Sequence, residues 1–388
     1  MPGIFHIPGR IHVQHMAERH DRTLAVIAGT LLALMAAGTA GCLAGLIPNE
    51  IVYPGITPVS GVPPLPDAVY VFPFQDQTIS FAVPVDSALL AGARQAEKSA
   101  HIYGDLSEEE WLPGYYLSFI SDPDLLPLYD ALGERFDAVR KAKSLDNDAY
   151  LELISTFVQS IPYETDAMLV APKFAIETIA DGKGDCDDKS LLLAALLARE
   201  GYAVALLYFE PEQHMAVGVT ASGFSYGNSG YAYIEATNVS YIGIPPDELT
   251  GGVVLTSEPV IIPVGSGTAG YGRCDETRVI DDARMRAKAA IVAYEADVAA
   301  MDAEMDGSLA DLEALAARME ALRHAGRNEE YNALVPVYNS KAAAYNEDIG
   351  TMQPSIDSYN RQVLIFNYIV THVHDRPGTY AWLMSTGA

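Results

Sequence analysis

The spacing of hydrophobic residues changes along the chain, and each change predicts a different kind of element. From residue 125 to residue 161, apolar residues recur every three or four positions, which is typical of amphipathic helices. Residues 202–209 and 213–219 are short and mostly apolar, as buried strands are. From about residue 276 onward, apolar residues follow a heptad pattern. This order predicts an α+β domain followed by a long helical region.

Local signals refine the first part of this domain. Residues 69–83 alternate in part between apolar and polar side chains, and they predict one or two strands around a turn at 75–77. Asp86 and Ser107 each precede a helical stretch and have side chains that cap a helix N-terminus. The pattern of stretch 182–237 predicts a loop, a helix and three strands.

The helix in this stretch begins with a cysteine. Gly182 and Gly184 permit a tight loop before it, and Asp185 is the expected N-cap. At a helix N-terminus the dipole and the free backbone N–H groups favour a thiolate, so we expect a lowered pKa for Cys186. The nearby carboxylate of Asp187 acts in the opposite sense, so the cysteine needs a cationic partner.

Two residues farther along the chain suit a cysteine nucleophile. His214 opens a predicted strand and has the chemistry of a base that activates the thiol and then protonates the leaving group. Glu235 lies near the end of another strand and is the candidate acid that holds the imidazole tautomer. For the oxyanion we expect the backbone N–H of Cys186 and the side-chain amide of Gln159.

Simpler structural explanations exist for the same residues. A cysteine at a helix start is more often inert than catalytic, and Asp185, Asp187 and Asp188 have the types and positions of capping residues. A calcium loop is disfavoured because the run lacks alternating oxygen ligands and a terminal glutamate at the proper spacing. Zinc bound through Cys186 and His214 lacks further Cys or His ligands nearby. We therefore expect no metal and no cofactor.

The combination of motifs is more specific than its parts. Gly-Asp-Cys-Asp-Asp-Lys-Ser precedes a leucine-rich helix, His-Met-Ala-Val-Gly-Val follows, and Tyr-Ile-Glu-Ala-Thr comes last. Over residues 151–246 the chain resembles the transglutaminase-like superfamily, most closely the archaeal and bacterial branch of predicted cysteine proteases. By this resemblance Cys186 matches the nucleophile, His214 the base and Glu235 the orienting acid. The superfamily usually has aspartate in the third position.

The resemblance implies a fold and a reaction. The fold is a papain-like core in which the cysteine lies on a helix packed against an antiparallel sheet. The reaction is acyl transfer through a thioester, either hydrolysis of an amide in a protein or peptide substrate or cross-linking when an amine replaces water. Neither the substrate nor the choice between water and amine follows from the resemblance.

Charge excludes one class of partner. The 388 residues include 51 acidic and 24 basic side chains, for a net charge of −27. Such a chain repels nucleic acid, so we expect no nucleic-acid partner. Three cysteines far apart in the sequence cannot form a disulfide framework.

The N-terminal residues predict a membrane anchor. Segment 1–22 contains three arginines, and segment 23–48 has no charged residue. Leu24–Ile47 is long enough to cross about 30 Å of hydrocarbon. The basic residues before it predict a single-pass protein of the cell membrane with the catalytic domain outside. A cleaved signal peptide of a secreted protein and a lipoprotein lipidated at Cys42 are the alternatives.

The remaining boundaries follow from composition. Prolines make 49–68 a stiff tether before the transglutaminase-like domain at 69–263. Glycines make 264–275 an exposed linker, and Cys274 within it receives no role. Residues 276–374 are expected to form an antiparallel coiled-coil hairpin, and 375–388 a tail. Its seam is predicted at Ile291, Tyr294, Val298, Met301, Met305, Ser308, Leu312, Leu315, Met319 and Leu322, and then at Tyr331, Val335, Tyr338, Ala342, Tyr345, Ile349, Met352, Ile356, Tyr359, Val363, Phe366 and Val370.

These observations lead to two functional hypotheses of different classes. The first is a membrane-anchored cysteine hydrolase with a Cys186–His214–Glu235 triad and a helical hairpin that binds a protein partner. The second is a catalytically inactive envelope scaffold that binds peptide and assembles through its coiled coil. A true cross-linking transglutaminase is a third, minor interpretation, and no residue decides it.

Overall fold

A four-stranded antiparallel sheet contains the strands that the sequence predicts around the site. The computed structural model describes residues 50–387, apart from 104, 166–170 and 250–251. The sheet order is β7-β6-β5-β8, and Pro263 lies in an edge strand, where its missing N–H interrupts no central ladder. The strands are β5 Val204–Phe209, β6 His214–Thr220, β7 Tyr231–Ile234 and β8 Val260–Val264.

Helix α6 (Cys186–Arg199) packs against β5 and β6 on one side and against α4 (Asn147–Ser160) on another. Its leucines are buried because they fill the space between these elements. At its start, the side chain of Asp185 accepts a hydrogen bond from the Asp188 amide at 3.2 Å. This is the N-cap that the sequence predicts.

A two-stranded ribbon and further helices complete the domain. β2 (Ala68–Phe74) and β3 (Gln77–Val83) form the predicted hairpin, with Tyr70 opposite Phe81. The rings of Phe72, Phe81 and Phe136 contact Phe157 of α4, with centroids 5.2–5.6 Å apart. The other elements are β1 Glu50–Val52, α1 Ser87–Gln95, β4 His101–Tyr103, α2 Glu108–Ser121, the 3-10 turn η1 Pro123–Leu125, α3 Leu126–Lys143 and α5 Ala175–Asp181. The fold is therefore α+β, as the sequence predicts.

The proline-rich stretch differs from the tether that we expected over 49–68. Ile56 is buried, and its amide donates to the Asp122 carboxylate at 2.7 Å. The amide of Val59 donates to the carbonyl of Ala88 at 2.9 Å. An apolar side chain and these two hydrogen bonds hold the extended backbone against the domain.

The glycine-rich stretch packs against the domain at several points, although Gly265, Ser266, Thr268, Gly270 and Gly272 are exposed. Tyr271 is only 2% exposed, and Cys274 is buried at the start of α7. A Cβ atom on Gly267 would lie 2.2 Å from the carbonyl oxygen of Tyr202, and one on Gly270 2.6 Å from the carbonyl oxygen of Thr220. The two glycines therefore let this segment lie directly on the backbone beside the sheet.

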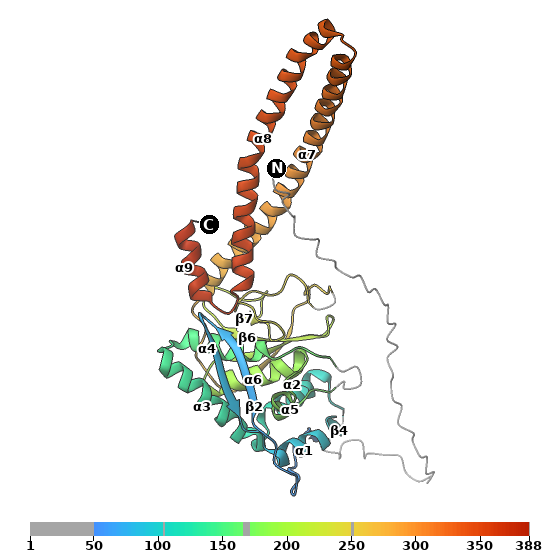
Figure 1. Cartoon of the computed structure of the whole chain (residues 1–388). Coiled ribbons are helices and arrows are strands. Elements are labelled where there is room, and N and C mark those ends of the chain that lie inside the picture. Colours follow the sequence, from blue (N-terminus) through green and yellow to red (C-terminus); the bar gives the residue numbers. More distant parts are fainter. Residues whose placement is uncertain (1–49, 104, 166–170, 250–251, 388) are drawn as a thin grey trace, which may run out of the picture. The chain divides into compact units, whose positions relative to one another are not determined.

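Two long helices, α7 (Cys274–His324) and α8 (Asn328–Thr371), run side by side and are joined by a short loop (Figure 1). Pro336 and Pro354 both lie inside α8. Every predicted seam position of α7 is buried or half-buried, and so are those of α8 except Ile349 and Val370. Nearly all of the predicted seam positions therefore face inward, but the heptad pattern missed buried residues nearer the domain, among them Ile280, Ala283, Ile365 and Ile369.

The chain after α8 forms a helix where we expected a tail. α9 (Arg376–Thr386) begins after Asp375, whose side chain accepts from the Gly378 amide at 3.0 Å. Arg376 is buried and pairs with Glu152 of α4 and Glu276 of α7. This ion-pair cluster and a small apolar cluster fix the base of the hairpin to the domain.

None of the helices among the described residues is both long and apolar enough to cross a membrane. The predicted anchor at 24–47 lies outside the described residues, as do segment 1–22 and Cys42.

Candidate active site

Cys186 and His214 line the same cavity, which has a volume of about 70 Å³. The cysteine comes from the first turn of α6, and the histidine is the first residue of β6. The sequence therefore nominated two residues that the fold brings together across 28 positions of the chain. The other lining residues are Tyr163, Glu212, Gln213, Thr237, Leu249 and Val253.

Backbone contacts place the sulfur at the start of β6. The amide of Met215, the residue after His214, forms a hydrogen bond with the Cys186 sulfur. One turn along α6, the hydroxyl of Ser190 donates to the carbonyl of Met215 at 2.9 Å. These two contacts fix the helix N-terminus against the strand that carries the histidine.

The loop before α6 is held by close backbone packing. The amide of Gly184 donates to the carbonyl of Pro162 at 3.1 Å. A Cβ atom at Gly184 would lie 2.8 Å from the Cβ of Asp188, so a side chain here would displace the capping turn. Glycine is therefore required for the approach of this loop to the segment that contains Tyr163.

His214, Tyr233 and Glu235 form a compact buried group. The Nε2 atom of His214 lies 3.3 Å from Oε2 of Glu235 and 3.1 Å from the hydroxyl of Tyr233. That hydroxyl donates to the same Oε2 of Glu235 at 2.6 Å. The expected acid thus lies next to the expected base, and a tyrosine hydroxyl joins them.

This arrangement assigns the tautomer of His214. Because the hydrogen of the Tyr233 hydroxyl is directed to Glu235, both oxygens that face Nε2 act as acceptors. Nε2 therefore carries the hydrogen when the ring is neutral, and Nδ1 keeps a free lone pair. Nδ1 is the nitrogen that can accept a proton from a substrate or a thiol.

Glu235 is held as a carboxylate. Burial by itself raises its pKa, but hydrogen bonds from His214, Thr237 and Tyr233 outweigh burial and lower the pKa to about 2. Thr237 contributes two of these bonds, from its amide at 2.8 Å and from its hydroxyl at 2.6 Å. The acid is therefore ionised at neutral pH and able to stabilise an imidazolium at His214.

The pKa of the Cys186 thiol is raised, whereas we expected a lowered value. Burial raises its pKa to about 12, and the carboxylates of Asp187 and Asp185 add to the effect. The hydrogen bonds from the backbone amides of Met215 and Asp187 act in the opposite direction but are weaker. Cys186 is thus a protonated thiol at neutral pH, because burial and the two carboxylates raise its pKa by more than the helix N-terminus lowers it.

The three aspartates of this turn act as structural groups. Asp185 caps α6, and a hydrogen bond joins its carboxyl to that of Asp187, whose pKa is raised by burial and by this neighbour. Asp188 accepts from the Lys173 amide at 2.6 Å and forms an ion pair with the Lys173 ammonium at 3.6 Å. Within the described residues, the carboxylates of these aspartates lie close enough together to bind a metal ion. Their hydrogen bonds and ion pair within the chain already account for their positions.

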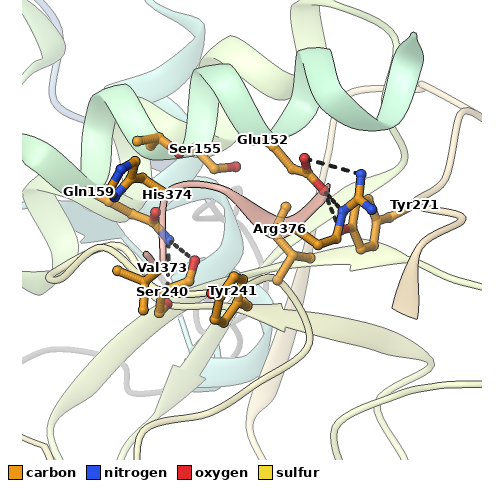
Figure 2. A pocket seen from close by; sticks show the side chains of 11 residues that line it. Glu152, Ser155, Gln159, Ser240, Tyr241, Tyr271, Val373, His374 and Arg376 are labelled. Carbon is orange, nitrogen blue, oxygen red and sulfur yellow. Dashed lines mark hydrogen bonds and ion pairs between the residues drawn. The ribbon is translucent and has the colours of Figure 1, made fainter. Parts of the chain in front are cut away.

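Gln159 does not support the oxyanion role that we expected. Its amide nitrogen donates to the carbonyl of Glu235 at 2.8 Å and to the carbonyl of Ser240 at 3.2 Å. It lines a different cavity, between α4 and the segment before α9, together with Ser240 and His374 (Figure 2). Gln159 therefore ties α4 to the chain that follows β7, because the backbone acceptors there take both of its donor hydrogens.

From the sequence we did not identify two residues, Tyr233 and Lys189, that form buried hydrogen bonds around the site. Tyr233 lies two positions before Glu235, so the alternation of a strand places both side chains on one face, and that signal was present. Lys189 is fully buried and donates to the carbonyls of Gln159, Ile161 and Thr237 at 3.2, 2.6 and 3.0 Å. A lysine one turn inside a leucine-rich helix gave no sign of these acceptors, which lie 28 to 48 positions away.

Comparison with models of known protein families, with curated proteins and with solved structures found no match.

Proposed function

We propose that this protein is a transglutaminase-like cysteine hydrolase with a papain-like core, which cleaves amide bonds of a protein or peptide substrate. The observation that carries the proposal is the group Glu235–Tyr233–His214, whose imidazole lines the same cavity as Cys186. A buried, ionised acid beside a histidine near a lone cysteine matches the roles of orienting acid, base and nucleophile.

The first half of the reaction forms a thioester. Nδ1 of His214 takes the proton of the Cys186 thiol as the sulfur attacks the amide carbonyl carbon. The imidazolium is stabilised by Glu235, and the backbone N–H of Cys186 faces the oxyanion, because the first N–H groups of a helix have no partner within it. The C–N bond then breaks, and His214 gives its proton to the departing amine.

The second half regenerates the thiol. Water loses a proton to His214 and attacks the thioester, the C–S bond breaks, and the sulfur recovers the proton. An amine in place of water would give a new amide, which is the cross-linking outcome. The raised pKa of Cys186 favours a mechanism in which proton transfer accompanies attack, rather than a preformed thiolate–imidazolium pair.

Covalent labelling tests the proposal directly. A peptide-based, thiol-reactive probe that mimics an amide should label the protein, and Cys186→Ala should abolish the labelling. His214→Ala should slow labelling by about a hundredfold, as expected for loss of a general base. Cys274→Ala is the control and should label normally. Equal labelling of Cys274 or Cys42 in the Cys186→Ala variant would contradict the proposal.

An inactive scaffold is the second candidate. The protonated state of Cys186 and the engagement of Gln159 by backbone carbonyls favour it. In that case peptides would bind without turnover, and Cys186→Ala would leave their affinity unchanged. The membrane anchor at 24–47, with the catalytic domain outside the cell, remains a sequence prediction for either candidate.

A further inference from the structure

The outer half of the α7–α8 hairpin contains an open groove between its two helices, with a volume of about 350 Å³. The residues of one wall recur at helical spacing along α7 and those of the other wall along α8. The groove therefore runs parallel to the two helices. In a pair of packed helices, the groove between them stays open to solvent on each side. A third amphipathic helix can bind in such a groove. This hairpin groove is lined by Leu309, Leu312, Glu313, Ala316, Tyr338, Ala342, Tyr345 and Asn346.

Two apolar side chains in and beside the hairpin groove are exposed to solvent. Leu309 is 39% exposed, and Ile349, which continues the α8 wall by one turn, is 44% exposed. Tyr338 and Tyr345 are half-buried, as most seam positions of the hairpin are. The groove therefore offers apolar area whose burial would stabilise a complex by about 25 cal/mol per Å² before binding costs.

One rim of the groove is acidic. Asp302, Asp306 and Glu313 recur at helical spacing on the face of α7 that carries Leu309. No ion pair to these three carboxylates occurs among the described residues of the chain. Between Lys288 and Arg318, α7 has no basic residue, so no side chain in this part of the helix neutralises the acidic rim.

We propose that the hairpin groove is a docking site for an amphipathic helix of a partner protein, with an apolar stripe bordered by lysine or arginine. The apolar stripe would pack on Leu309, Tyr338 and Tyr345, and the basic edge would pair with the acidic rim. The charge argues against a second copy of this chain as the occupant, because a second hairpin would bring the same carboxylates to the same rim.

A fluorescent peptide tests the site on the full-length chain. The probe is a synthetic Leu–Lys helix of about 18 residues, roughly 27 Å long, with leucines in one stripe and lysines along its edge. Fluorescence anisotropy should show binding that weakens as salt is raised. A scrambled peptide of the same composition, in which no stripe forms, should bind at least about tenfold more weakly.

Matched variants locate the binding. Leu309→Glu and Tyr345→Ser should each weaken binding about tenfold, whereas Leu364→Glu, at an exposed leucine outside the groove, should not. The double variant Asp306→Asn/Glu313→Gln should weaken binding more than Asp297→Asn/Glu304→Gln. Both remove the same charge from α7, but helical spacing places the second pair on the opposite face. Circular dichroism confirms that each variant keeps its helix content.

Several outcomes would overturn the inference. Equal loss in the two double variants would mean that the overall negative field, not the groove, attracts the peptide. Equal binding of the scrambled peptide, unchanged binding by Leu309→Glu, or no binding of the Leu–Lys helix would exclude the site. A dimer in sedimentation that Leu309→Glu dissociates would make a second copy the occupant.

Discussion

Nε2 of His214 lies 3.3 Å from Oε2 of Glu235, and both side chains are buried. The pair joins the first residue of β6 to the residue that follows β7, so the register of two neighbouring strands sets the distance. Glutamate reaches one methylene farther than aspartate. In this protein the longer side chain still brings its carboxylate to the imidazole.

The first prediction concerns Glu235 and acid stability. Its pKa is about 2 in the folded protein against an ordinary value of 4.5, so the folded state holds the ionised form. The resulting stabilisation, about 3 kcal/mol, is fully present above pH 4.5 and is lost as the pH falls toward 2. Glu235→Gln should flatten this part of the pH dependence of the unfolding free energy, measured by urea titration. Glu97→Gln, at an exposed position, should leave the curve unchanged; an equal effect in both would refute the assignment.

The second prediction concerns Tyr233. Removing its hydroxyl in Tyr233→Phe deletes a hydrogen bond that lowers the pKa of Glu235, so that pKa should rise. The acid limb of the activity profile should move to higher pH, and kcat/KM should fall by about tenfold, for a loss on the order of 1 kcal/mol. Tyr226→Phe is the matched control, because its hydroxyl faces the Ser257 carbonyl instead of the site. A profile that keeps its shape would show that Tyr233 only packs.

The third prediction concerns the reactivity of Cys186. With a pKa of about 12, the thiol should react slowly with iodoacetamide, at a rate that rises about tenfold per pH unit between pH 6 and 9. Asp187→Asn should speed the reaction at alkaline pH, since that carboxylate raises the pKa of the cysteine. Asp282→Asn on α7 serves as the control, in a background that lacks Cys42 and Cys274. A rate that reaches a plateau below pH 7 would instead reveal a preformed thiolate.

The fourth prediction concerns Lys189. Lys189→Met fills the same space but leaves three buried carbonyl groups without a donor. We expect a loss of about 3 kcal/mol in the free energy of unfolding, measured by urea denaturation. Lys141→Met, at a surface lysine with a 3.7 Å ion pair, should change stability by less than about 1 kcal/mol. Similar losses in the two variants would indicate that the buried hydrogen bonds contribute little.

Local patterns explain why the elements were predictable. Asp185 caps its helix through a contact three residues away, and seam residues such as Leu312 face inward because the heptad repeats within one helix. Both signals depend on neighbours in the sequence, so they can be read without the fold. Ile349 and Val370 are the exceptions, since the pattern predicts their side of the helix but not whether another element covers them.

The sequence by itself predicted the strands and helices around the site and the long helical hairpin, though not α9, and it nominated Cys186, His214 and Glu235. Only the tertiary structure decided what surrounds them: the tyrosine hydroxyl that contacts both His214 and Glu235, the burial that keeps the Cys186 thiol protonated, and the backbone carbonyls that accept hydrogen bonds from Gln159. It also decided that Arg376 pairs with Glu152, which lies 224 positions earlier in the chain. The physical reason is that caps and periodicity act over a few residues. Burial, pKa values and hydrogen-bond partners depend on atoms that become neighbours only when distant segments pack.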